Sequence, residues 1–337
     1  MKKSITNVLA VAILLLSGAC LYAQQSEVYV LDRNIPLTGD GGFDYLSIDA
    51  INHRLYVSHG TSVNVIDLET EHAIGEIKEM QGVHGIAIAN DLNRGFISDG
   101  RADAVVVFDL KTLKTITTIK VSGRGPDAIT YDPYSQRVFS FNGESNNASV
   151  IDAKTLKQIG TVDVGGGPEF AVPDGKGKIY NNLEDKNSLN VIDSKSLKVI
   201  NNYPLSPCGG PTGLALDQSN QRLFTGCRQN KGMSVVDANS GKVITTVSIG
   251  AGVDAVAYDP MTKLVFCSNG DGTTNIFKQE SADEYKPVQT LNTQVRAKTM
   301  ALDLKTHKIY LSVADFETGT RKVKPGTFKV LVYKMKS

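Results

Sequence analysis

The chain has 337 residues, of which 41% are hydrophobic and 21% are charged, and its formal net charge is +1. This is the composition of an ordinary globular protein. The near-neutral charge excludes a strong long-range attraction to nucleic acid or to anionic lipid.

The first 23 residues have the organisation of a secretory signal peptide. Lys2 and Lys3 precede an unbroken apolar run over residues 8–16, and small residues follow. The run is too short to span a bilayer comfortably, and no second apolar stretch of spanning length follows it. We therefore expect a periplasmic or secreted protein without a transmembrane span. Residues 24–337 are expected to form a single domain and a monomer.

Cys20 leaves a second kind of export open. A lipoprotein signal would make this cysteine the lipidated first residue of the mature protein. Such signals usually have a large aliphatic residue three positions upstream, and Ser17 stands there instead. The sequence favours simple cleavage after residue 23, with a lipid anchor as the alternative.

After this leader, one unit recurs about every forty-two residues. A β-branched segment ends in an acidic residue in five of the units, and an aromatic residue stands inside a short strand-like segment in all seven. Two markers with a common period indicate a tandem repeat architecture. The acidic markers are Asp67, Asp109, Asp152, Asp193 and Asp237, and the aromatic markers are Tyr56, Phe96, Phe139, Tyr180, Phe224, Phe266 and Tyr310.

Each unit divides into four short β segments. In the third unit these are Ala128–Tyr131, Arg137–Phe141, Ala148–Asp152 and Gln158–Val162, with turn-forming residues between them. No sustained helical periodicity of apolar residues occurs. The sequence therefore predicts an all-β fold, a seven-bladed β-propeller with four-stranded blades.

The two ends of the repeat region complete one another. The seventh unit offers three β segments, near residues 299–303, 308–313 and 328–333, whereas the N-terminal segment 28–37 belongs to no unit. We expect this segment to supply the fourth strand of the last blade, which removes an exposed sheet edge. Two insertions, Gln279–Pro287 and Asp315–Gly326, are predicted as exposed hairpins or loops.

The segments "LYVSHG…VNVIDLET…IGEI" and "RVFSFNG…ASVIDAKTLKQIGTV" resemble the YVTN-type repeat of YncE-like proteins, and the likeness covers about residues 28–334. The absence of tryptophan distinguishes the chain from WD40 repeats. The resemblance implies a periplasmic or surface propeller. Most members of the family have no established catalytic activity, and single-stranded DNA binding has been suggested for some.

Related propellers include subunits of quinoprotein amine dehydrogenases and of cytochrome-bearing nitrite reductases. This chain has no C-x-x-C-H haem motif, no tryptophan to form a quinone and no nucleotide-binding loop followed by a helix. Any cofactor is therefore unknown, and a divalent metal is the one candidate that the residues suggest.

Propeller geometry brings equivalent positions of the innermost strands into one ring at the mouth of the central channel. The loops after each second strand, and the loops that enter the blades, are expected at the same face. The ring consists of Asp44, His84, Asp127, Glu169, Thr212, Asp254 and Lys298. The loops add His59, Asp99, Arg101, Asn142, Glu184, Arg228, Asn269, Arg124 and Arg296.

We interpret this face as a polar ligand site, in which four of the ring residues would hold a cation: Asp44, His84, Asp127 and Glu169. Clustered carboxylates raise one another's pKa unless a cation compensates them. An imidazole among carboxylates suits Zn²⁺, Mn²⁺ or Fe²⁺, and oxygen ligands alone suit Ca²⁺. The alternative is a hydrated mouth whose carboxylates form salt bridges with Lys298 and the arginines.

The fifth unit contains two cysteines. Cys208 enters this unit from the candidate face and Cys227 leaves its second strand toward the same face, so we predict a disulfide between them. Free thiols are the alternative. Cys267 is predicted to be a small buried apolar residue.

Three functions remain open from the sequence. The first is a non-catalytic scaffold that binds a small polar molecule or another exported protein. The second is a metal-assisted hydrolase or lactonase, or an accessory subunit of an exported oxidoreductase. The third, single-stranded nucleic-acid binding, is disfavoured because the chain lacks a basic excess and its repeated aromatic residues look like core.

Overall fold

The computed structural model describes residues 28–39, 41–320 and 322–336. The predicted signal peptide and Cys20 lie outside these residues. Strands dominate the described chain, and the only helices are three short 3₁₀ turns, namely η1 (Asn90–Leu92), η2 (Gly100–Ala102) and η3 (Glu184–Lys186). None of the helices in the described ranges is long or apolar enough to cross a membrane.

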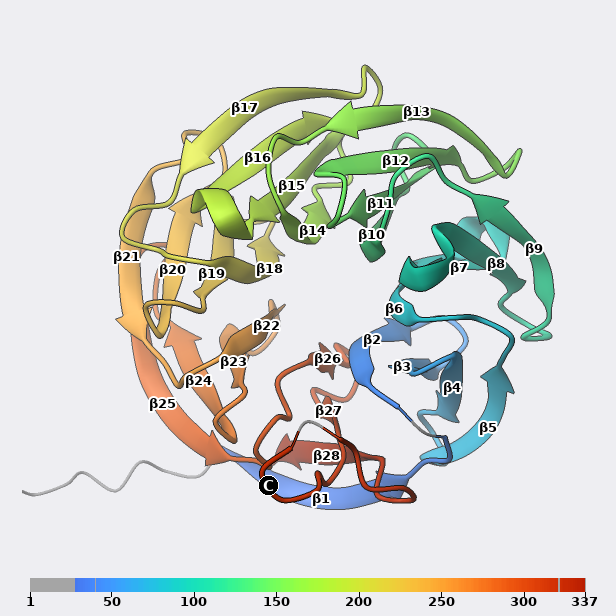
Figure 1. Ribbon diagram of the computed structural model, residues 1–337. Coiled ribbons are helices and arrows are strands. Elements are labelled where there is room, and N and C mark those ends of the chain that lie inside the picture. Colours follow the sequence, from blue (N-terminus) through green and yellow to red (C-terminus); the bar gives the residue numbers. More distant parts are fainter. Residues whose placement is uncertain (1–27, 40, 321, 337) are drawn as a thin grey trace, which may run out of the picture.

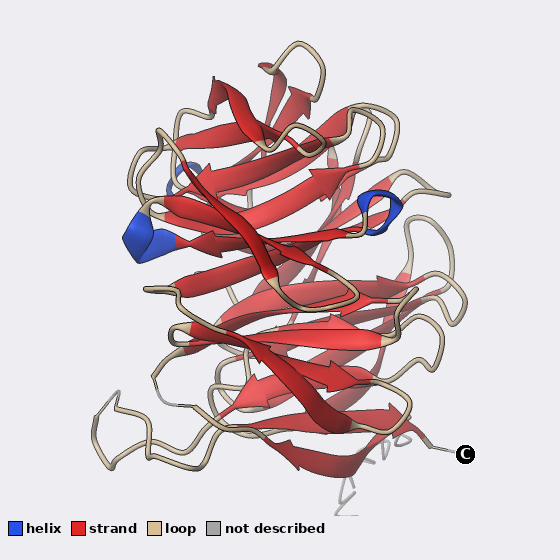
Figure 2. Cartoon of the chain, turned by 90° about the vertical axis from the view of Figure 1, so that its right-hand side faces the viewer, coloured by secondary structure: helices blue, strands red, loops and turns tan. Residues whose placement is uncertain are grey.

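Seven antiparallel sheets of four strands each surround a central axis, as Figure 1 shows. The predicted seven-bladed β-propeller is therefore confirmed. In the first six blades the chain runs outward from the axis through four consecutive strands. Figure 2 shows the same sheets from the side, with turns and loops at both faces of the disc.

The strands of the first three blades follow one another without a gap in the chain. Blade 1 consists of β2 (Phe43–Asp49), β3 (Arg54–His59), β4 (Ser62–Asp67) and β5 (His72–Ile77). Blade 2 consists of β6 (Val83–Ala89), β7 (Arg94–Asp99), β8 (Ala104–Asp109) and β9 (Thr115–Lys120). Blade 3 consists of β10 (Pro126–Asp132), β11 (Arg137–Asn142), β12 (Asn147–Asp152) and β13 (Lys157–Asp163).

The next three blades repeat this order. Blade 4 consists of β14 (Pro168–Pro173), β15 (Lys178–Leu183), β16 (Ser188–Asp193) and β17 (Lys198–Pro204). Blade 5 consists of β18 (Pro211–Asp217), β19 (Arg222–Cys227), β20 (Gly232–Asp237) and β21 (Val243–Ser248). Blade 6 consists of β22 (Val253–Asp259), β23 (Leu264–Asn269), β24 (Thr273–Gln279) and β25 (Tyr285–Asn292).

The seventh blade is built from both ends of the described chain. Its strands are β26 (Met300–Leu302), β27 (Ile309–Val313), β28 (Lys329–Met335) and the N-terminal β1 (Tyr29–Pro36). β1 pairs antiparallel with β28, and the two strands lie side by side at the bottom of Figure 1. The predicted closure of the ring by residues 28–37 is confirmed.

The core lies between adjacent blades. The second and third strands of each blade carry buried apolar residues on both of their faces. The repeated aromatic marker of each blade is fully buried. Tyr56, for example, packs on Phe108 of the next blade with ring centroids 5.3 Å apart. A strand buried on both faces favours β-branched and aromatic residues, which is why the repeat contains them.

The two insertions differ from each other. The described residues of the segment, 315–320 and 322–326, form a loop between β27 and β28, with a bridge between Phe316 and Val323. The insertion over Gln279–Pro287 is a hairpin, one of the two predicted forms, because Gln279 ends β24 and Tyr285 begins the antiparallel β25. Only its predicted exposure is wrong, at Tyr285. Tyr285 is buried, with its ring centroid 5.5 Å from that of Phe224, and this packing extends both strands.

Candidate functional site

Residues at the start of each innermost strand surround the mouth of the channel. In blades 1 to 6 the strand bulges at this position, because the pairing with the second strand shifts just after the first residue. A bulge re-aims the side chain that it carries. The bulge therefore gives the ring residues a direction that a regular strand would not.

The acidic side of the mouth carries three carboxylates and one imidazole. Nδ1 of His84 lies 2.8 Å from Oδ2 of Asp44 and 3.6 Å from Oδ1 of Asp127. One ligand atom from each of these three residues lies within 4.8 Å of the others. Glu169 is not part of this compact group, so the structure brings together three of the four residues predicted to hold a cation.

The opposite side of the mouth is electrically compensated. Arg228 contacts Asp254 and also Glu184, the latter at 2.7 Å between Nη1 and Oε1. Lys298 contacts the second oxygen of Asp254. The side chain of Asp254 is only 7% exposed, and two cations satisfy it. Thr212 is buried, and its hydroxyl is used within the fold, where it donates to the carbonyl of Val253 at 3.0 Å.

Titration behaviour follows from this uneven pairing. Burial, together with the charge of Asp44, raises the pKa of Asp127 to about 6. Burial and the charge of Asp127 raise the pKa of Glu169 to about 9. Burial alone would lower the pKa of His84, but its hydrogen bond with Asp44 and the charges of Asp127 and Asp44 raise it above the ordinary value.

Two aromatic rings from different blades are in contact next to the polar ring residues. The centroids of Tyr45 in blade 1 and Phe170 in blade 4 are 4.7 Å apart. Burial and four surrounding carboxylates raise the pKa of Tyr45 well above its ordinary value, so its hydroxyl stays protonated. We call the space next to these two rings and the four residues Asp44, His84, Asp127 and Glu169 the acidic cup, and the two rings its aromatic floor.

The contact between Tyr45 and Phe170 was not predicted, although the sequence contains a pattern that indicates it. The residues that follow the ring residues are small in five blades and aromatic in two. A ring of small residues leaves axial space that two large side chains can fill. The small residues are Gly85, Ala128, Gly213, Ala255 and Thr299.

Four of the predicted loop residues serve the blades instead of facing the mouth. His59 is buried and stacks on Phe328 with centroids 3.8 Å apart. Asp99 accepts hydrogen bonds from the backbone N–H groups of Gln81 and Gly82. The side-chain amides of Asn142 and Asn269 donate to residues of their own blades.

These four residues share one position, the last residue of a second strand, and its side chain faces the loop that enters the blade. Arg124 is exposed in its entry loop. Of the predicted ligand-binding set, the structure therefore gathers seven residues at the mouth: Asp44, His84, Asp127, Glu184, Arg228, Asp254 and Lys298. Glu169 also belongs to this group, because it interacts electrostatically with Asp127 and Arg228.

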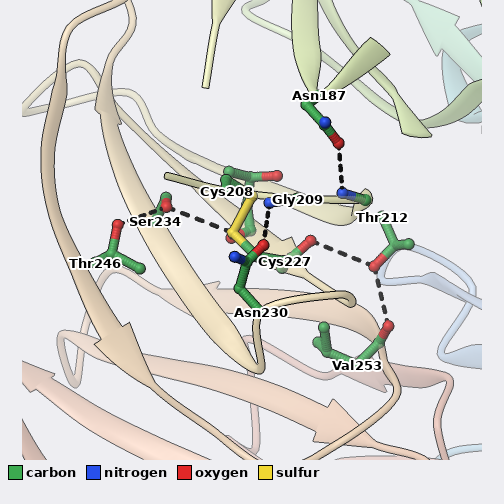
Figure 3. The surroundings of a disulfide bond; sticks show 12 residues. Asn187, Cys208, Gly209, Thr212, Cys227, Asn230, Ser234, Thr246 and Val253 are labelled. Carbon is green, nitrogen blue, oxygen red and sulfur yellow. Dashed lines mark hydrogen bonds between the residues drawn. A yellow bond between two sulfur atoms is a disulfide. The ribbon is translucent and has the colours of Figure 1, made fainter. Parts of the chain in front are cut away.

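The predicted disulfide is present. Cys208 and Cys227 are bonded, both are buried, and 19 positions separate them in the sequence. Figure 3 shows that hydrogen bonds brace the bond on both sides. Cys267 is a free, buried cysteine, as expected. Because Arg228 follows Cys227 directly, the disulfide anchors the strand end that presents this arginine to the mouth.

Comparison with known proteins supports the fold but does not assign the protein to a family. No family model matches the chain, and no curated protein matches its sequence. Solved structures do match. A chain in the structure of Kuenenia stuttgartiensis hydrazine synthase has a TM-score of 0.71 and 16% identity, and the match covers 86% of this chain and 95% of that chain.

A chain in the crystal structure of a mitotic checkpoint complex is similar over nearly its whole length. Its TM-score is 0.76 and its identity 14%, with 98% of this chain and 99% of that chain covered. This protein is therefore a β-propeller. At such low identity the likeness shows the fold alone, because this fold hosts many unrelated functions. The resemblance to YVTN-type repeats rests on the sequence motifs quoted above.

Replacement of Glu169 by glutamine is expected to stabilise the protein above neutral pH. A carboxyl whose pKa is raised by folding stabilises the folded state only while it is protonated. This contribution is lost as the pH rises from about 4.5, its ordinary pKa, to about 9. Because the mouth is open to water, we expect a gain of about 1 kcal/mol for Glu169→Gln at a pH near 8.5.

Thermal unfolding followed by circular dichroism at a pH near 5 and near 8.5 measures this effect. The stability difference between Glu169→Gln and the wild type should grow between the two conditions. Glu144→Gln removes an exposed carboxylate from the same face and should show no such trend. Equal differences at both pH values would contradict the raised pKa of Glu169.

Proposed function

We propose that this protein is an exported binding propeller whose channel mouth holds a small, positively charged ligand. One observation carries the proposal: in the described part of the chain, neither Asp127 nor Glu169 forms an ion pair with a lysine or arginine. Oδ1 of Asp127 is buried and has no hydrogen-bond partner. Carboxylates that are partly buried and left without a lysine or arginine partner attract a cation.

Export is supported by the organisation of residues 1–23 and is compatible with the disulfide, because disulfides persist in oxidising compartments. A rigid ring that carries a polar cup suits a binding role, since no part of the scaffold has to reorganise around the ligand.

Two chemical forms of the ligand fit the cup. A divalent metal ion would take one atom each from Asp44, His84 and Asp127, whose ligand atoms are already within 4.8 Å of one another. An organic ammonium group would lie between the carboxylates and the aromatic floor of Tyr45 and Phe170, which offers a cation–π contact. Both forms use the same negative charge.

Isothermal titration of the purified protein distinguishes the two forms. The probes are manganese, zinc and calcium chloride on one side and putrescine on the other. We expect one of these cations to bind, and Asp127→Asn to weaken that binding by about tenfold or more, since a charged ligand contact contributes about 1.5–3 kcal/mol. Glu144→Gln serves as the matched control and should leave the affinity unchanged.

Failure of all four probes to bind would contradict the proposal, and so would an Asp127→Asn variant with wild-type affinity. A preference for a metal ion over putrescine, abolished by His84→Gln, would assign the metal form. A preference for putrescine that survives His84→Gln would assign the ammonium form.

The affinity for the cation is expected to rise with pH. The pKa values of Asp127, Glu169 and His84 are all raised, so near neutral pH the empty cup holds protons that a cation must displace. Binding should therefore release protons, most of all between about pH 6 and 9. Titrations in two buffers of different ionisation enthalpy measure the number released; a value of zero would contradict this account.

A metal-assisted hydrolase is the second candidate, and the compact group of Asp44, His84 and Asp127 favours it. Three protein ligands with an open position are the usual arrangement of a catalytic metal site. Hydrolysis of a small lactone by the metal-loaded protein tests this candidate. Turnover that exceeds that of metal-loaded Asp127→Asn would support it, and equal rates would dismiss it.

A further inference from the structure

A second cavity opens beside the cup, beneath the loop inserted into blade 7. Its volume is about 740 Å³, a size that suits a small organic molecule. Apolar side chains line one part of it, and basic side chains line another. The apolar residues are Phe43, Phe316 and Val323, and the basic residues are Arg296, Lys298 and Lys322. No acidic residue is among the described residues that line this cavity.

The aromatic wall of this cavity is built by residues from different parts of the chain. Phe316, in the inserted loop, and Phe43, at the start of β2, have ring centroids 6.2 Å apart. Phe43 also packs against Phe328 at 5.5 Å. The wall is therefore supported from behind, and both Phe43 and Phe316 are only partly buried. A flat apolar molecule can cover the part of the two rings that water now contacts.

The three cations of the cavity differ in how they are paired. Lys298 bonds to Asp254, and Lys322 pairs with Glu317 at 2.9 Å. Arg296 forms no ion pair within the described ranges of the chain. Its guanidinium lies 3.8 Å from the ring centroid of Phe316, and Nη2 donates to the carbonyl of Thr320 at 3.2 Å. Stacking fixes the guanidinium plane and leaves the other N–H groups at its edge for an anion.

The position of Arg296 in the repeat also distinguishes blade 7 from the other blades. In the six other blades a glycine precedes the innermost strand, whereas blade 7 has Arg296 at this position. The φ angle of Arg296 is 74°. Three of the six equivalent glycines have a similar positive φ, namely Gly125 at 66°, Gly210 at 60° and Gly252 at 73°, and the other three do not. Sixteen non-glycine residues of the described chain have a positive φ, so the conformation alone does not distinguish Arg296. What distinguishes it is a cationic side chain at a position where every other blade has glycine. The six glycines are Gly42, Gly82, Gly125, Gly167, Gly210 and Gly252.

We propose that this cavity, formed by Phe316, Lys322 and Val323 of the inserted loop and by the start of β2, binds a small, flat, apolar carboxylate. The apolar body lies against Phe43 and Phe316, and the carboxylate accepts hydrogen bonds from Arg296, with Lys298 and Lys322 adding positive charge. The site differs in ligand class and in the sign of its charge from the acidic cup, so it adds a second binding activity to the proposed one.

Naphthoate is a suitable probe, because it joins a flat apolar body to one carboxylate. Its affinity for the purified protein is measured by displacement of the fluorescent dye anilinonaphthalenesulfonate. We expect naphthoate to bind about tenfold or more tightly than naphthalenemethanol, which has the same body without the charge. Naphthalenemethylamine, which carries the opposite charge, should bind more weakly still.

The decisive variant is Arg296→Gly, which installs the residue that the other six blades use. It should weaken naphthoate binding by about tenfold or more and leave naphthalenemethanol binding nearly unchanged. Because glycine adopts a positive φ without strain, the melting temperature should stay the same or rise. Lys186→Gln removes one positive charge from the same face in blade 4 and should not affect naphthoate.

Several results would overturn this proposal. One is equal affinity for naphthoate and naphthalenemethanol, and another is wild-type naphthoate affinity in Arg296→Gly. A clear loss of melting temperature in Arg296→Gly would assign the arginine a structural role instead. Phe316→Ser gives an independent test, since it should weaken the acid and the alcohol alike. Asp127→Asn, which tests the acidic cup, should leave naphthoate binding intact, so each proposal can fail without the other.

Discussion

A chain that begins at residue 38 is expected to lose most of its folding stability. Such a chain lacks β1, which pairs with β28 from Tyr29 opposite Met335 to Pro36 opposite Lys329. It also lacks the buried side chains of Tyr29, Ile35 and Leu37. Each large apolar side chain contributes about 1.5–3 kcal/mol when buried, so the loss amounts to about 6 kcal/mol. This is comparable with the total stability of a typical domain.

The loss has a second consequence at the sheet edge. Without β1, strand β28 becomes the outer strand of blade 7, and its unpaired backbone groups invite aggregation. Urea unfolding and light scattering, compared with a chain that begins at Val28, measure both effects. A synthetic peptide of residues 28–37 should restore part of the stability, because it can add the missing strand. A truncated chain as stable as the reference would refute the closing role of β1.

Tyr29 provides a finer test of the same contact. Its hydroxyl donates to the carbonyl of His307 at 2.6 Å, and its ring packs edge-on against Phe266 with centroids 5.2 Å apart. Tyr29→Phe should cost about 1 kcal/mol for the hydrogen bond, whereas Tyr29→Ala should cost about 3–5 kcal/mol because it also leaves a cavity. Equal costs would mean that the ring packing contributes nothing to the closure.

Removal of the disulfide should produce the second large effect. The bond between Cys208 and Cys227 closes a loop with a sequence separation of 19, and the chain-entropy model assigns about 3 kcal/mol to a loop of this size. The double variant Cys208→Ala/Cys227→Ala should lose about this much unfolding free energy. Cys267→Ala, at the other buried cysteine, should cost about 1 kcal/mol and gives the matched control.

The disulfide should also affect the mouth. Gly209, next to Cys208, donates its N–H to Asn230 in the loop after Cys227, as Figure 3 shows. The N–H of Gly210 donates to Asn187 of blade 4 at 2.8 Å. In the sequence Arg228 lies between Cys227 and Asn230, and its side chain contacts Glu184 and Asp254. Loosening the loop should therefore change cation binding at the cup.

Reductant separates the disulfide from the substitutions themselves. It should lower the melting temperature of the wild type and leave that of the double alanine variant unchanged. A wild type that unfolds at the same temperature with and without reductant would show that the bond does not stabilise the fold. Thiol counting in a denatured, unreduced chain that begins at Val28 should find a single free thiol, that of Cys267.

The blades could be predicted because each one is a local pattern. A β-branched segment, a turn and an aromatic strand recur with one period, and four such segments cannot bury their apolar faces except against the neighbouring blade. Over residues 279–287 the predicted hairpin is present, but its predicted exposure is wrong at Tyr285, which is buried although Asp283, Glu284 and Lys286 surround it in the sequence. The contact of Tyr285 with Phe224 outweighs these charged neighbours, and only the packed blade shows that contact.

The candidate site divides along the same line. The repeat by itself determined which residues share a height at the mouth, since equivalent positions of a closed ring must lie around one axis. Only the tertiary structure decided how their charges are paired. Arg228 and Lys298 contact Asp254, and His84 contacts Asp44 more closely than Asp127. Among the described residues, no lysine or arginine pairs with Asp127 or Glu169. It also decided that Arg296 stacks on Phe316. Ion pairing depends on distances of a few ångströms between loops of different blades, and the spacing of residues along a chain does not encode such distances.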